Sequence, residues 1–158
     1  MSVVHLHLLL NHVPVIGMFF VAFILGVAIW RGNDGMAKLA LATLAGIGAI
    51  AAVVYFTGEP AEEAVEHLAG VGESMIHEHE EAAEIAFIGS SLAGLFAVAL
   101  LLWSRTRPLA RSLWTITLLG VLAVAGLMAR TASLGGQIRH TEISSGTSGR
   151  EARQSEDH

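Results

Sequence analysis

Apolar and polar residues are arranged along the chain in long blocks. Four runs, residues 13–30, 39–58, 85–103 and 112–129, contain no charged side chain. Each is close to the roughly 17–25 residues that an α-helix needs to cross the hydrocarbon layer of a bilayer. No run alternates polar and apolar positions, so a membrane β-barrel is disfavoured. The pattern predicts an all-α integral membrane protein, a bundle of four transmembrane helices.

The composition agrees with a chain that resides in the lipid bilayer. Hydrophobic residues make up 53% of the 158 positions and charged residues 15%, whereas soluble domains carry roughly 25% charged residues. The chain has no cysteine, which excludes disulfides, Cys-ligated zinc, iron–sulfur clusters and c-type haem attachment. A net charge of −5 argues against nucleic acid as a partner.

The predicted membrane domain covers residues 1–142 and is followed by a polar tail, 143–158, that we expect to be disordered. An acidic connection, residues 59–77, separates the second and third spans. No Lys or Arg precedes Arg31, so the first span lacks the basic start of a signal peptide and is expected to be retained. We place the spans at about 5–31, 37–58, 78–104 and 109–134.

The distribution of Lys and Arg predicts the orientation. The loops after the first and third spans are basic, while residues 59–84 are rich in Glu and have no Lys or Arg. The positive-inside rule places the basic loops in the cytoplasm. Both termini and the acidic connection then lie on the outer, periplasmic side of a bacterial inner membrane. Trp30, Trp103 and Trp114 lie beside the basic loops, as interfacial aromatic residues do.

Histidines before the tail all fall on the predicted outer side. Imidazole is the commonest metal ligand in proteins and the usual axial ligand of a b-type haem, so their concentration on one side indicates a cofactor or metal site there. These histidines are His5, His7, His12, His67, His77, His79 and His140.

Several Glu and His pairs have a spacing that suits metal binding. Glu63 and His67 are four residues apart, as are His77 and Glu81, so each pair lies on one helical face. Mixed oxygen and nitrogen ligands suit divalent zinc, iron, manganese or copper. The metal-ligand candidates are His5, Glu63, His67, His77, Glu81 and Glu84.

A haem b site is the other interpretation of the same side. His12 with His77 or His79 is the preferred axial pair, and Arg130 and Arg139 are candidates to meet the propionates. Pro14 makes an irregular helix near these histidines plausible. The cofactor-binding candidates are His7, His12, His79, Arg130, Arg139 and His140.

The segment His7-x4-His12-x-Pro14 resembles the HPxxxHFP-type signature that opens a family of small four-span bacterial membrane proteins of unknown function. Thr57-Gly58, a His at 77 or 79, and Gly135-Gly136 are similar to that family too. Leu8 stands where the family has its first Pro, and Val13 where it has Phe. The resemblance implies a haem- or redox-associated membrane module.

Three functions remain open at this stage. The first, favoured, is a redox module that binds haem b and transfers electrons, with a quinone or a periplasmic electron carrier as partner. The second is a divalent-metal-binding membrane protein. The third is a non-catalytic accessory subunit of a larger membrane complex, or a homo-oligomer. No enzymatic reaction is assigned, and we see no internal repeat in the sequence.

Overall fold

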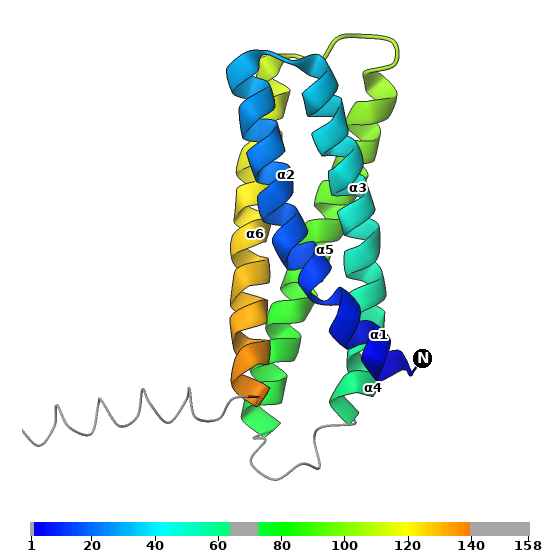
Figure 1. Ribbon diagram of the computed structural model, residues 1–158, viewed down its shortest axis with the longest axis vertical. Coiled ribbons are helices and arrows are strands. Elements are labelled where there is room, and N and C mark those ends of the chain that lie inside the picture. The colour runs from blue at the N-terminus through cyan, green and yellow to red at the C-terminus, as the bar shows by residue number, and fades with distance from the viewer. Residues whose placement is uncertain (1, 64–72, 140–158) are drawn as a thin grey trace, which may run out of the picture.

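The computed structural model describes residues 2–63 and 73–139, and this part of the chain is helical almost throughout. Four of its helical segments are long and apolar enough to cross a membrane, which confirms the prediction of an all-helical chain with four candidate spans. The described helices are α1 (Val3–Leu10), α2 (His12–Arg31), α3 (Asp34–Phe56), α4 (Gly58–Glu63), α5 (Glu73–Trp103) and α6 (Arg111–Arg139) (Figure 1).

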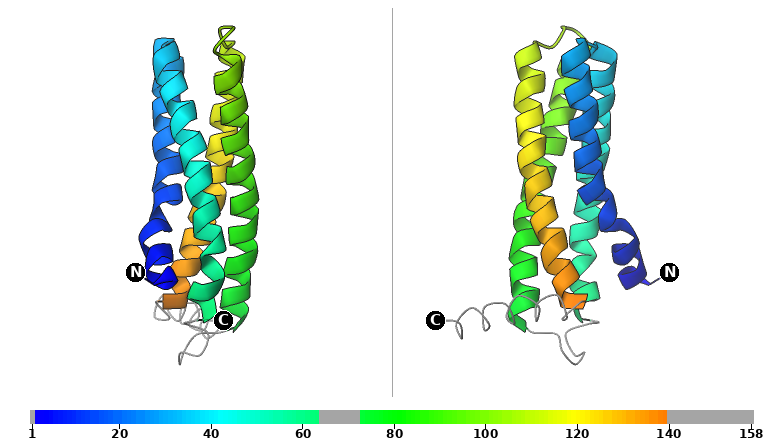
Figure 2. Two further views of the ribbon diagram at one scale, coloured as in Figure 1. Left: turned by 90° about the vertical axis from the view of Figure 1, so that its right-hand side faces the viewer. Right: turned by 60° about the vertical axis from the view of Figure 1, so that its left-hand side comes forward.

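The four long helices form one antiparallel bundle (Figures 1 and 2). α3 packs against α2 and α5, and α6 packs against α5 and α2, so neighbours in the chain are neighbours around the bundle. The short helices α1 and α4 lie beside each other at one end. That end also carries the first turns of α5 and the last turns of α6. We call it the histidine end, and the opposite end the loop end.

The turn between α2 and α3 is short because its two residues have the right backbone preferences. Gly32 takes a left-handed conformation with φ of 62°, and its N–H caps the carbonyls of Ala28 and Ile29. Asn33 then caps α3, since its side-chain oxygen accepts from the N–H of Met36 at 2.9 Å. The two caps end one helix and start the next within two residues.

The first span is divided near its start. α1 ends at Leu10 and α2 begins at His12. Pro14 has no N–H to donate to the Leu10 carbonyl, so the helical ladder is interrupted there. α1 consequently leans away from the axis of α2 and contacts α3 and α4 (Figure 2). The sequence predicted this irregularity from the same proline.

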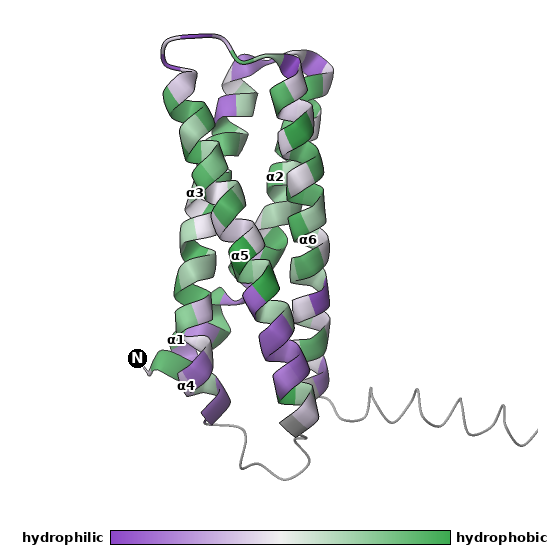
Figure 3. Ribbon diagram, turned by 180° about the vertical axis from the view of Figure 1, so that it is seen from behind, coloured by the Kyte–Doolittle hydropathy of each residue, from purple (hydrophilic) through white to green (hydrophobic). Residues whose placement is uncertain are grey.

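Side chains that face away from the bundle are as apolar as those inside it. On α2, Met18 and Leu25 are fully buried, whereas Phe20 is 57% and Phe23 is 68% exposed. Figure 3 shows apolar residues along the middle of the helices and hydrophilic residues gathered at the ends. Exposed aromatic side chains of this density suit contact with lipid hydrocarbon, as expected for a multi-pass membrane protein.

α3 and α5 approach each other closely at two glycines. A Cβ on Gly48 would lie 3.0 Å from the carbonyl oxygen of Ser90 and 3.1 Å from the Cα of Gly94. Both neighbouring atoms belong to the backbone. The absence of side chains at Gly48 and Gly94 therefore lets the two helices touch along their main chains, as is common between membrane helices.

Some predicted boundaries differ from the structure. α5 begins at Glu73, five residues before the expected start at 78, so the His77–Glu84 stretch belongs to the helix. The acidic connection contains a further helical turn, α4. The described chain starts and ends at the histidine end, as the predicted topology requires. Which side of the membrane that end faces stays a prediction, and residues 143–158 lie outside the described part.

Candidate functional site

His7 is held by the end of the second span. Its Nδ1 lies 3.0 Å from the carbonyl oxygen of Val54 and 3.4 Å from the hydroxyl of Thr57. Val54 belongs to the last turn of α3, where carbonyls lack a partner within their own helix. The hydroxyl of Thr57 donates to the same carbonyl at 3.0 Å, so His7 joins a hydrogen-bonded helix end and is half-buried there.

His79 is held in the same manner by the fourth span. Its Nδ1 lies 3.1 Å from the carbonyl oxygen of Thr131 on α6. The hydroxyl of Thr131 donates in turn to the carbonyl of Ala82 on α5 at 3.0 Å. Thr131 thus ties α5 to α6 twice, once through its side chain and once through its carbonyl. His79 is half-buried between these helices.

The two hydrogen bonds locate one proton on each ring. A carbonyl oxygen only accepts, so the Nδ1 of His7 and the Nδ1 of His79 must each carry the proton. A neutral ring of this tautomer presents an unshared electron pair at Nε2. The histidine end therefore offers two nitrogen donors, one from α1 and one from α5.

A glycine lies against each ring. A Cβ at position 58 would be 3.7 Å from Cε1 of His7, an ordinary contact. A Cβ at position 135 would be 3.0 Å from Cε1 and 3.4 Å from Nδ1 of His79, which is tighter than side chains tolerate without a shift. Gly58 and Gly135 are the residues that the family resemblance singled out, and the structure gives each of them a neighbour.

The remaining histidines of the described segments are exposed. His5 lies 2.7 Å from the hydroxyl of Ser2, which also caps α1. His77 pairs with Glu81 at 3.4 Å and with Glu80 at 3.8 Å, and its side chain is 71% exposed. His12 begins α2 and is exposed as well.

The candidate metal ligands that the structure describes do not form a group of three. Across residues 2–63 and 73–139, no group of three or more His, Asp or Glu is placed to hold a metal ion. Glu63, Glu81 and Glu84 are all exposed. His67 lies outside the described residues, so the predicted Glu63–His67 pair is untested. The His77–Glu81 pair exists, on the solvent-facing side of α5.

The structure holds His7 and His79 by hydrogen bonds to the main chain, whereas His12 is exposed and has no such bond. The sequence favoured His12 because it lies nearer to the apolar run, but depth in the sequence does not decide which way a side chain points. His12 follows the break in the first span and lies about 140° around a helix from His7. His77, two residues before His79, lies about 200° away on α5 and faces outward.

The structure describes only one of the two arginine side chains that were predicted to meet the haem propionates. Arg130 is exposed, and no ion pair joins it to Glu84 although both residues are described. The backbone of Arg139 ends α6, but its side chain and His140 lie outside what the structure describes. Their role beside the histidines therefore stays a prediction.

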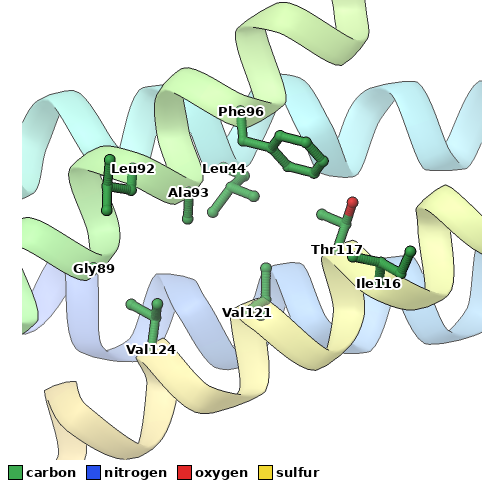
Figure 4. A pocket seen from close by; sticks show the side chains of 10 residues that line it. Leu44, Gly89, Leu92, Ala93, Phe96, Ile116, Thr117, Val121 and Val124 are labelled. Carbon is green, nitrogen blue, oxygen red and sulfur yellow. The ribbon is translucent and has the colours of Figure 1, made fainter.

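A groove of about 280 Å³ opens between α5 and α6, nearer to the middle of the bundle (Figure 4). Gly89, Ala93 and Gly120 leave the space, and Leu44 closes its floor. Its one polar lining residue, Thr117, already donates to the carbonyl of Leu113 at 2.7 Å. The groove therefore suits a hydrocarbon chain and offers no free hydroxyl to a polar group.

No family model, no curated protein and no solved structure matches this chain. The resemblance to the four-span family accordingly stays a prediction.

Proposed function

We propose that the protein binds a b-type haem between His7 and His79 and carries electrons in the membrane. The observation that carries the proposal is the matched state of the two rings. Each keeps its Nδ1 on a main-chain carbonyl and leaves the electron pair of Nε2 for a metal. The two donors come from different helices, as axial ligands in a helical bundle do.

The number of protein donors favours haem over a bare metal ion. A zinc site needs three or four protein ligands, and no such group is present in the described part of the chain. Two imidazoles are sufficient for haem, because the macrocycle itself fills the equatorial positions of the iron. The residues at the histidine end therefore fit this group better than zinc, manganese or copper.

The surroundings of the rings support the same role. The carbonyls of Val54 and Thr131 fix the direction of each imidazole and raise the basicity of its free nitrogen. Gly58 and Gly135 leave the ring edges unobstructed. When bound, haem supplies one-electron chemistry between its ferric and ferrous states, and the protein sets the potential through these ligands.

The proposal names the redox partner only by its chemical class. A quinone in the bilayer or a periplasmic electron carrier would exchange electrons at the histidine end. Arg130 is exposed on α6 and is free to meet a propionate.

Absorption spectra of the detergent-purified protein test the proposal. We expect a Soret band, sharp α and β bands after dithionite reduction, and iron equimolar with the chain. A colourless sample with equimolar zinc, manganese or copper would replace haem by a bare metal. A colourless sample without metal, after expression with added haem precursor, would refute both and favour the accessory-subunit interpretation.

A further inference from the structure

The first and third spans open with the same motif. His5-x-His7 begins the first span and His77-x-His79 begins the third. In both, the first imidazole is exposed and the second is half-buried and bonded to a carbonyl. The correspondence thus holds for the sequence and for the environment of each ring.

Gly89 follows Gly17 by the same number of residues along the sequence as His79 follows His7. Each glycine faces a branched side chain of the next span, Ile47 for Gly17 and Val124 for Gly89. A second constant spacing separates Ile47 from Val124 and also Gly58 from Gly135. The contact of Gly17 with Ile47 in the first half is therefore matched by that of Gly89 with Val124 in the second half.

The helix boundaries follow the same two spacings. α2 and α5 end at matching positions, and α3 and α6 begin at matching positions. The second spacing is longer than the first because the connecting loops differ, residues 32–33 in one half and 104–110 in the other. The longer second loop accounts for the whole difference, so no insertion is needed inside a helix.

Each half builds the same arrangement around its inner histidine. The imidazole donates to one main-chain carbonyl. Its Cε1 lies beside the glycine that follows the carbonyl-bearing residue by four positions. The carbonyl and glycine are those of Val54 and Gly58 for His7, and of Thr131 and Gly135 for His79.

The packing of the halves has two-fold character. The first helix of each half contacts the second helix of the other, α2 with α6 and α5 with α3. The close pair Gly48 and Gly94 has as its counterpart Ala22 and Ala125, which are also buried in the same core. An approximate two-fold axis therefore runs along the bundle and exchanges the two inner histidines, His7 and His79.

We propose that the protein is a duplicated helical hairpin in which each copy supplies one identical half-site, with Gly58 and Gly135 as the positioning residues. The ligand lies on the two-fold axis between His7 and His79. The chemical class of this ligand rests on the proposed function. A metal-centred planar macrocycle would present two equivalent binding positions, which match two equivalent imidazoles. The sequence pattern alone indicated no internal repeat, because the two halves share only a few residues, at key positions.

The halves differ where the first copy has Pro14 and the second has Ala86. The proline breaks the helix in the first copy, whereas α5 continues unbroken through the matching position. The half-site survives this difference, since His7 still reaches its carbonyl. The His–carbonyl–Gly arrangement is thus retained although the local helix is not.

Nitrogen NMR of the full-length, ¹⁵N-histidine-labelled protein in detergent tests the equivalence of the half-sites. The sample is read as purified if colourless and in the reduced state if haem is present. Two rings are expected with a protonated Nδ1 and an unprotonated Nε2, and His7→Gln and His79→Gln each remove one of them. If either ring instead carries its proton on Nε2, the half-sites are not equivalent and the inference is overturned.

A cross-link tests the two-fold axis independently of any ligand. Because the axis maps the contact of Gly48 with Gly94 onto Ala22 and Ala125, Ala22→Cys with Ala125→Cys is expected to form a disulfide on mild oxidation. The chain has no cysteine of its own to compete. Ala22→Cys with Ala123→Cys, which points outward, is the control. Cross-linking of the control pair alone would overturn the symmetry. Equivalent rings and a successful cross-link in a colourless protein would retain the duplication and refute the haem function.

Discussion

Gly48→Ala places a methyl group where α3 and α5 approach each other closely. The new Cβ would lie 3.0 Å from the carbonyl oxygen of Ser90 and 3.1 Å from the Cα of Gly94. No rotamer relieves this contact, because both neighbours are backbone atoms. The helices must separate by a few tenths of an ångström, and the contacts around Gly48 loosen with them.

Gly46→Ala is the matched control. Gly46 lies on the same helix, and a Cβ there meets nothing within 4 Å. Both substitutions gain the same helical preference of alanine over glycine, up to about 1 kcal/mol. The difference between the variants therefore isolates the packing cost, about 1–3 kcal/mol for an overpacked core.

Thermal unfolding in one detergent, followed by circular dichroism, measures this difference. We expect Gly46→Ala to unfold at or slightly above the wild-type temperature. Gly48→Ala should unfold below Gly46→Ala by roughly 2–4 °C for each kcal/mol of packing cost. Equal midpoints for the two variants would refute the close main-chain contact between α3 and α5.

Three further outcomes follow from the contacts at the histidine end. Gly135→Ala should shift the His79 ring and alter or abolish the haem spectrum, whereas Gly136→Ala, whose Cβ meets nothing within 4 Å, should not; absorption spectra compare them. Thr131→Val should lose about 1 kcal/mol of unfolding free energy relative to Thr115→Val, whose hydroxyl bonds only within its own helix; equal denaturation midpoints would contradict this. His77→Ala should change stability by less than about 1 kcal/mol, because its pairs with Glu80 and Glu81 are exposed; a larger loss in the same assay would contradict an exposed role.

The spans were predictable because the hydrocarbon layer imposes a length and an uncharged composition on them. The end of the second span, near residue 58, and the irregularity at Pro14 followed from local chemistry. The start of α5 did not, because its first turns are polar and the membrane rule detects only the apolar part. Helical preference of a Glu- and Ala-rich segment extends it back to Glu73.

The candidate site was predictable as a region and less so as a set of residues. The one-sided histidines pointed to the end of the bundle where the structure places His7 and His79. The choice between His7 and His12 depended on where the helix breaks, and the choice between His77 and His79 on helix phase. The partners of the inner histidines are main-chain carbonyls, which every residue has, so no sequence signal marks Val54 or Thr131. Only the glycines beside them, Gly58 and Gly135, were visible in advance.

Absorption spectra of four single variants test the central assignment most directly. Wild-type protein and the variants His7→Ala, His79→Ala, His12→Ala and His77→Ala are purified side by side and reduced with dithionite. We predict that the bands of six-coordinate haem are lost from His7→Ala and His79→Ala and kept in the other two. Retention in His7→Ala together with loss in His12→Ala, or a colourless wild-type protein, would contradict the assignment of His7 and His79 as the ligand pair.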